Sequence, residues 1–151
     1  MAAEKNFLQV EELLELATKF EQDSMQYYRD LRRYVSEPQA VELLKHLEQQ
    51  EREHRDLLRN YDPGDKAYPM LQYGPALELT MPQVEEEEPD VFHLLDVAIE
   101  REIVSKQVYE NTAGQVFGNL AELLRDLAGF EEEHEIKLKD MRDYLKGQES
   151  S

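Results

Sequence analysis

Apolar residues recur at alternating spacings of three and four along four stretches of the chain, which is the repeat of one face of an α-helix. The first stretch carries Val10, Leu14, Ala17, Leu31 and Val35 in this phase. The pattern predicts four helices, over about 7–35, 37–60, 90–117 and 119–146.

Residues that favour helix ends stand near these boundaries. A polar side chain able to accept a hydrogen bond from the first helical turn precedes each stretch, and Gly147 stands where the last helix should end. The predicted N-caps are Asn6, Ser36, Asp90 and Asn119.

The periodicity disappears between residues 62 and 89, where prolines and glycines exclude a continuous helix. An extended segment of about 28 residues can reach along a helix of ~38 Å. This segment therefore predicts a crossover that makes the second and third helices parallel, with short hairpin connections near Ser36 and Gly118. The expected fold is all-α: one domain over 1–151, built as a four-helix bundle of two hairpins joined by a long crossover loop.

Ionisable side chains interrupt every apolar stripe near its middle. The first and third stripes contain Glu-x6-Tyr, as Glu21–Tyr28 and Glu102–Tyr109, and the second and fourth contain Glu-x-x-His, as Glu51–His54 and Glu131–His134. Four-helix bundles that project one Glu from each of two helices and a Glu-x-x-His pair from each of the others build two-metal carboxylate centres. The predicted metal ligands are Glu21, Glu51, His54, Glu102, Glu131 and His134.

The two halves of the chain also repeat. A shift of 81 positions places Glu21 and Tyr28 on Glu102 and Tyr109, and a shift of 80 places the first Glu-x-x-His motif on the second. This repeat predicts two hairpins related by a pseudo-twofold axis, with their ligand sets facing each other.

Charge balance explains why six such residues would lie on apolar stripes. Buried, unpaired carboxylates cost several kcal/mol each, whereas two divalent cations neutralise four of them and neutral imidazoles complete the coordination. Oxygen and nitrogen ligands suit two iron ions, with manganese or a mixed pair as alternatives. The competing interpretation places some of these residues on helix flanks, paired with Arg or Lys.

Tyr28 and Tyr109 lie ~10 Å along the axis from the glutamate of their own helix. We therefore expect each hydroxyl to donate to a ligand from a neighbouring helix and hold that carboxylate in place. The alternative is a core tyrosine whose hydroxyl bonds elsewhere.

Other acidic and histidine residues fall off the inward stripes. Solvated positions are expected for Glu100, Glu132 and Glu133, and exposed ones for His46 and His93. The run Glu85–Glu88 is expected to be solvated as well, with a role in metal uptake as the alternative.

Composition narrows the function further. The chain has no cysteine, which excludes disulfides, thiol catalysis and cysteine-ligated metal centres. A formal charge of −17 argues against a nucleic-acid partner. Neither a signal peptide nor an apolar run of ~20 residues is evident, so no membrane partner and a cytoplasmic protein are expected. Apolar residues predicted to face outward favour a homodimer: Phe7, Leu13, Leu16 and Phe130.

Together, the two Glu-x6-Tyr and two Glu-x-x-His motifs over about 7–146 resemble the ferritin-like di-iron carboxylate superfamily, most closely its rubrerythrin-like branch. By that resemblance Glu51 and Glu131 bridge two irons, Glu21 and His54 complete one site, and Glu102 and His134 complete the other. The chain departs from rubrerythrin in lacking the cysteine-ligated iron domain, which implies an external electron-donor protein. It also has Ser105 where rubrerythrin carries an additional carboxylate, and the symmetric ligand set is closer to that of bacterioferritin. Arg52 replaces the haem-binding methionine of bacterioferritin, so no haem is expected.

The resemblance implies a non-haem di-iron oxidoreductase that reacts with peroxide or dioxygen. One alternative is an iron-storage or iron-handling protein of the ferroxidase type. The other is a non-catalytic metal-bound bundle that serves as a sensor or as a docking surface for a partner.

Overall fold

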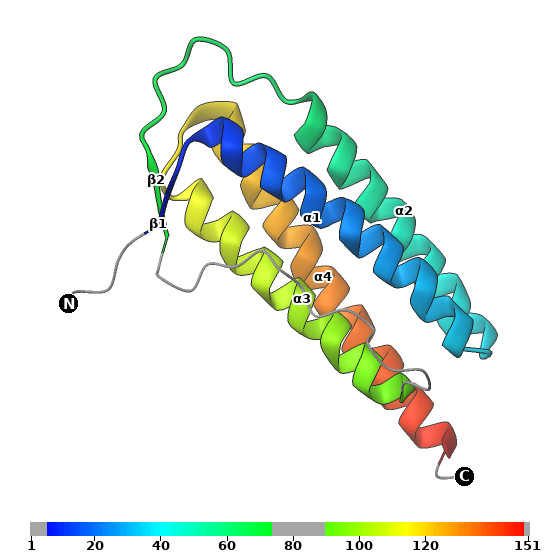
Figure 1. Cartoon of the computed structure of the whole chain (residues 1–151). Helices are drawn as coiled ribbons and strands as arrows, with labels where there is room; N and C mark the ends of the chain where they lie inside the picture. Colours follow the sequence, from blue (N-terminus) through cyan, green and yellow to red (C-terminus); the bar gives the residue numbers. More distant parts are fainter. Residues whose placement is uncertain (1–5, 74–89, 150–151) are drawn as a thin grey trace.

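The computed structural model describes residues 6–73 and 90–149, and these form a bundle of four α-helices (Figure 1). The helices are α1 (Val10–Leu31), α2 (Pro38–Asn60), α3 (Val91–Ala113) and α4 (Gly118–Glu149). A single turn of 3-10 helix, Arg32–Tyr34, follows α1. The predicted four-helix architecture is confirmed.

The helices pack as two hairpins. Helices α1 and α2 lie side by side and form the first hairpin, and α3 and α4 form the second in the same way. Figure 1 shows that α2 and α3 run in the same direction, and that α1 and α4 run in the opposite one. Helix α3 thus begins at the end of the bundle farthest from the last residue of α2, as the predicted crossover requires.

A small antiparallel sheet lies at one end of the bundle, which the sequence did not predict. Strand β1 (Asn6–Leu8) pairs with β2 (Leu71–Tyr73), in a register that joins Phe7 to Gln72. The sheet corrects two predictions: residues 6–8 do not belong to the first helix, and Asn6 is not its cap. Gln9 takes the N-cap position instead, where its backbone N–H donates to the Glu12 carboxylate at 3.2 Å.

Further boundaries differ from those predicted: α1 ends at Leu31 and α3 at Ala113, before the expected positions of about 35 and 117. Glu37, rather than Ser36, caps α2, because its carboxylate accepts from two backbone N–H groups of the first turn while Pro38 needs no such partner. Helix α4 begins at Gly118, whose φ of 66° suits glycine, so Asn119 lies inside the helix. The helix also continues through Gly147.

Asp90 does cap α3, where its side chain accepts from the Phe92 N–H at 2.9 Å. The predicted run Glu85–Glu88 lies outside the described residues.

Two apolar clusters fill the bundle, one on each side of a central polar layer. The cluster at the sheet end includes Leu13, Leu71 and Leu124, and the other includes Leu31, Leu44 and Leu95. Leu13 is 2% exposed, so its predicted outward position is wrong: a second buried row runs beside the stripe on α1. Phe7, Leu16 and Phe130 are exposed as predicted.

None of the helices in the described part of the chain is both long enough and apolar enough to cross a bilayer.

Candidate metal centre

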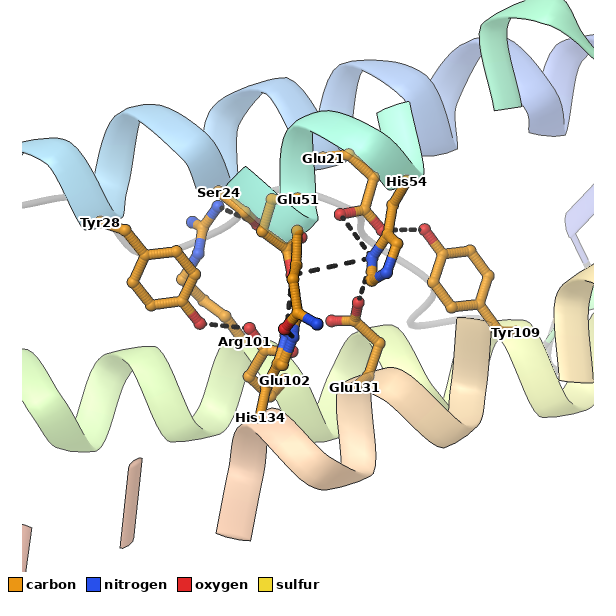
Figure 2. A network of polar contacts seen from close by, with 11 residues as sticks. Glu21, Ser24, Tyr28, Glu51, His54, Arg101, Glu102, Tyr109, Glu131 and His134 are labelled. Carbon is orange, nitrogen blue, oxygen red and sulfur yellow. Dashed lines mark hydrogen bonds and ion pairs between the residues drawn. The ribbon is translucent and has the colours of Figure 1, made fainter. Parts of the chain in front are cut away.

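The central polar layer contains the six predicted ligands, brought together from all four helices (Figure 2). Each of these side chains is at most 3% exposed. Their positions follow from the helical repeat: each lies on the stripe that its helix turns toward the bundle axis, between the two apolar clusters. The competing placement on helix flanks is therefore wrong for all six.

The six residues form two overlapping groups whose ligand atoms lie within 4.8 Å of one another. Each group combines residues of both hairpins, and both groups include Glu51 and Glu131. One group is Glu21, Glu51, His54 and Glu131, and the other is Glu51, Glu102, Glu131 and His134. Two glutamates are thus placed between two potential cation positions.

The imidazole Nδ1 atoms face the carboxylates across the junction of the hairpins. His134 Nδ1 lies 2.9 Å from Glu51 Oε1, and His54 Nδ1 lies 3.2 Å from Glu131 Oε1. Neither contact has hydrogen-bond geometry. The two imidazole rings stack with centroids 5.8 Å apart, so their Nδ1 atoms belong to one shared cluster.

Many polar atoms of this cluster have no hydrogen-bond partner among the described residues. They include both carboxylate oxygens of Glu51 and of Glu131, one oxygen each of Glu21 and Glu102, and the Nδ1 atoms of both histidines. Buried polar groups are normally satisfied, because an unpaired one costs about 1–3 kcal/mol. Unpaired oxygen and nitrogen atoms that converge in this way are suited to bind cations.

Burial and mutual repulsion perturb the protonation of the carboxyls. Burial raises the pKa of Glu51 and of Glu131 well above the ordinary value, and the charges of neighbouring glutamates raise it further. Burial likewise raises the pKa of Glu21. Burial acts in the same sense on Glu102, but its contacts with Glu131, His134 and Tyr28 outweigh it and lower the pKa. Without cations, the cluster therefore retains protons that free carboxylates would have lost.

The His54 imidazole is held in its neutral form. Burial, reinforced by the nearby His134, lowers the pKa of His54 to about 4. A neutral imidazole is the form that binds a metal ion.

Two buried tyrosines contact the cluster from opposite ends of the polar layer (Figure 2). The Tyr28 hydroxyl on α1 donates to Glu102 on α3, and the Tyr109 hydroxyl on α3 donates to Glu21 on α1. Each tyrosine therefore bonds a glutamate of the neighbouring helix, as expected. Burial raises the pKa of both hydroxyls well above its ordinary value, so both remain donors.

Arg101 is a buried cation that the sequence did not reveal. Its side chain is 4% exposed, and its guanidinium donates to Ser24 Oγ at 3.0 Å and lies 5.0 Å from the centroid of the Tyr27 ring. Arg101 is in phase with Ala98 and Ser105 along α3, on the edge of the predicted stripe. This helical phase could have indicated that Arg101 is buried, but arginine is rarely buried, so the pattern alone did not suggest it.

Gln50 was missed as well. Its Oε1 lies 2.6 Å from His134 Nε2, the ring nitrogen that faces away from the carboxylates. No sequence pattern indicated this contact, because Gln50 lies off the apolar stripe and the contact depends on how α2 and α4 pack.

The residues predicted to lie outside the site do so. Glu100, Glu132, Glu133, His46 and His93 are all exposed.

Comparisons with known proteins support the fold but indicate no function. No protein-family model matches the sequence, and a search of curated proteins finds no match. A solved structure, that of a hypothetical protein from Pyrococcus furiosus, is similar over 93% of this chain and 92% of that chain, with a TM-score of 0.69 and 22% sequence identity. The class defined so far is a four-helix bundle with a buried carboxylate–imidazole cluster that could hold metal.

Proposed function

We propose that this chain is a ferritin-like, rubrerythrin-related di-iron carboxylate protein that acts as an oxidoreductase toward peroxide or dioxygen. The observation that carries the proposal is the pair of overlapping ligand groups that share Glu51 and Glu131. The parallel α2 and α3, and the reciprocal sequence motifs, support the ferritin-like assignment.

The donor set fits two divalent cations. Four glutamates carry a formal charge of −4 when ionised, and the unpaired oxygens and Nδ1 atoms point into one buried volume. Arg101 cannot provide the compensation alone, because one guanidinium carries a single positive charge. Glu21 and His54 would hold one cation and Glu102 and His134 the other, while Glu51 and Glu131 belong to both ligand groups.

When bound in the ferrous state, the two irons supply the two electrons that reduce peroxide or dioxygen. The protein residues have three tasks in this reaction. The apolar clusters on both sides exclude bulk water from the centre. Tyr28 and Tyr109 hold Glu102 and Glu21 in place through their hydroxyls. The glutamates would release their retained protons as cations bind, and their negative charges would balance those of the cations. Reduction by an external electron-donor protein is part of the proposal.

The experiment combines metal analysis with reactivity. The proposal predicts two irons per chain after aerobic loading and an oxo-bridge absorption in the near ultraviolet. The anaerobic ferrous protein should then oxidise rapidly with one of the two oxidants and turn over when a reductant is supplied. Slow oxidation by both, without turnover, would contradict the oxidoreductase.

Iron handling of the ferroxidase type is the second candidate, and Ser105 favours it. This buried residue stands where an additional carboxylate would make the centre asymmetric, and here the set of six is symmetric. Iron handling predicts many ferric ions per chain in a large assembly. A homodimer that retains about two irons would argue against it.

A further inference from the structure

The pseudo-twofold relation fails at the residue directly before each shared glutamate. A shift of 80 positions places Gln50 on Phe130. Gln50 contacts His134 through its amide oxygen, whereas the Phe130 ring lies 5.2 Å from the His54 ring, tilted by 46°. Each side chain therefore covers the imidazole of the opposite hairpin, but one cover is polar and the other is apolar.

The Gln50 contact fixes which nitrogen of His134 carries the proton. An amide oxygen only accepts, so His134 Nε2 donates to it, and in the neutral imidazole this leaves the lone pair on Nδ1. That lone pair belongs to the atom 2.9 Å from Glu51 Oε1, inside the cluster. A hydrogen bond of this kind also orients the ring and raises its basicity as a ligand.

Phe130 does not provide His54 with a comparable hydrogen-bond acceptor. A phenyl ring offers no comparable acceptor, and no described residue accepts a hydrogen bond from His54 Nε2. No described side chain therefore holds the Nε2 proton of His54, and binding a cation through Nδ1 must select that tautomer without such help.

We infer that the two metal positions are unequal: the position at Glu102 and His134 takes up a divalent cation first, and Gln50 is the positioning residue that causes this order. The inference rests on the proposed metal centre and adds the sequence in which it fills. Glu51 and Glu131 contribute to both positions, so their effect largely cancels in the comparison. Loss of a partner of this kind typically costs 10–100-fold in metal affinity, so we expect the two binding steps to differ by about that factor.

Arg101 acts in the opposite sense. Its buried positive charge interacts with Glu102 and repels a cation bound beside that carboxylate. If the His54 position filled first, the charge of Arg101 would outweigh the Gln50 hydrogen bond, and the inference would be overturned.

Cobalt(II) titration of the metal-free full chain tests the order of filling. Calorimetry under anaerobic conditions should resolve two steps. Proton NMR of the cobalt-loaded protein should show one paramagnetically shifted, slowly exchanging imidazole N–H with the first equivalent, because the Nε2 proton of His134 is held by Gln50. A single step with two equal affinities would refute the inference.

Variants at the two related positions provide matched controls. Gln50→Leu should weaken the first step about 10–100-fold, merge it with the second and remove the protected N–H signal. Gln50→Glu keeps an acceptor and should retain both steps. Phe130→Leu should leave both steps unchanged, whereas Phe130→Gln should tighten the second step by supplying the missing acceptor.

Two outcomes separate this inference from the proposed function. Fewer than two cobalt ions per chain would contradict the metal centre itself. Two ions bound in steps that Gln50→Leu leaves separate would contradict only the role of Gln50. Circular dichroism of the metal-free variants should match that of the parent, since Gln50 is only half-buried and Phe130 is exposed.

Discussion

Tyr28 on α1 donates its hydroxyl hydrogen bond to Glu102 on α3, so the two residues join the two helical hairpins. Tyr109 and Glu21 make the reciprocal bond in the opposite direction. Each tyrosine thus steadies a carboxylate that belongs to the partner hairpin. The arrangement couples the geometry of the proposed metal ligands to the packing between hairpins.

Replacement of either tyrosine by phenylalanine should weaken metal binding and preserve the fold. Without the hydroxyl, Tyr28→Phe leaves Glu102 free to rotate, and we expect a loss of about 10–100-fold in affinity for the cation at that position. Cobalt(II) titration measures the change. Tyr27→Phe is the control, because the Tyr27 hydroxyl donates to the Leu94 backbone carbonyl rather than to a proposed ligand. Equal losses in the Tyr27 and Tyr28 variants would contradict the prediction.

Ser24 and Ser105 occupy equivalent positions and should respond oppositely to replacement by alanine. Ser24 accepts a hydrogen bond from the buried Arg101, so Ser24→Ala should destabilise the protein by about 1–3 kcal/mol. The Ser105 hydroxyl is buried without a hydrogen-bond partner among the described residues. Ser105→Ala should therefore be neutral or stabilise by roughly 1 kcal/mol. Urea unfolding of both metal-free variants measures this difference, and equal destabilisation would count against it.

Glu51→Gln should change stability in opposite directions with and without metal. In the metal-free protein the substitution removes a buried carboxyl that other glutamates repel, so we expect a gain on the order of 1–3 kcal/mol. In the loaded protein it removes a shared ligand, and with it much of the stabilisation of about 2.7 kcal/mol per ion expected at 100 times Kd. Thermal unfolding with and without the cation measures both effects. The exposed Glu100→Gln is the control and should change neither.

The metal-free protein should lose stability as the pH rises above about 6.5. Glu51 and Glu131 have a raised pKa in the folded state, so the folded protein holds more protons than the unfolded chain, and each extra proton lowers the unfolding free energy by about 1.4 kcal/mol per pH unit. His54 acts in the opposite direction, but only between pH 4 and 6.5, because its pKa falls from 6.5 to about 4 on folding. Its contribution is therefore constant above that range.

Urea unfolding between pH 6.5 and 8 tests this dependence. Bound divalent cations replace the retained protons, so the loaded protein should show a flatter profile. The slope of the metal-free protein should also decrease in Glu51→Gln. A metal-free protein whose stability does not change over this range would show that the carboxyls have already ionised.

The ligand positions were predictable from the sequence because helical phase alone determines them. Glu21 and Glu102 fall on the same stripe as the leucines and alanines around them, and burial follows from that position. Gln50 and Arg101 were not predictable in this way. Their contacts reach across helices, to His134 and Ser24, and depend on interhelical packing that periodicity does not contain.

The ends of the elements were the less predictable part of the fold. Strand β1 is three residues long and pairs with residues more than sixty positions away, so no local repeat could indicate it. Gly147 failed as a stop signal, since α4 continues to Glu149, where the Gln148 side-chain amide donates to the Tyr144 hydroxyl one turn back. Local competition of this kind, worth about 1 kcal/mol, decides where a helix ends.

Neither hairpin carries a complete set of ligands, since each group draws residues from both. Cations bound there would link one half of the molecule to the other, at the place where the negative charges of the glutamates otherwise repel. The stability of the packing between the two hairpins would then depend on the concentration of the metal ion. Amide hydrogen exchange at the inward faces of the helices would measure this dependence.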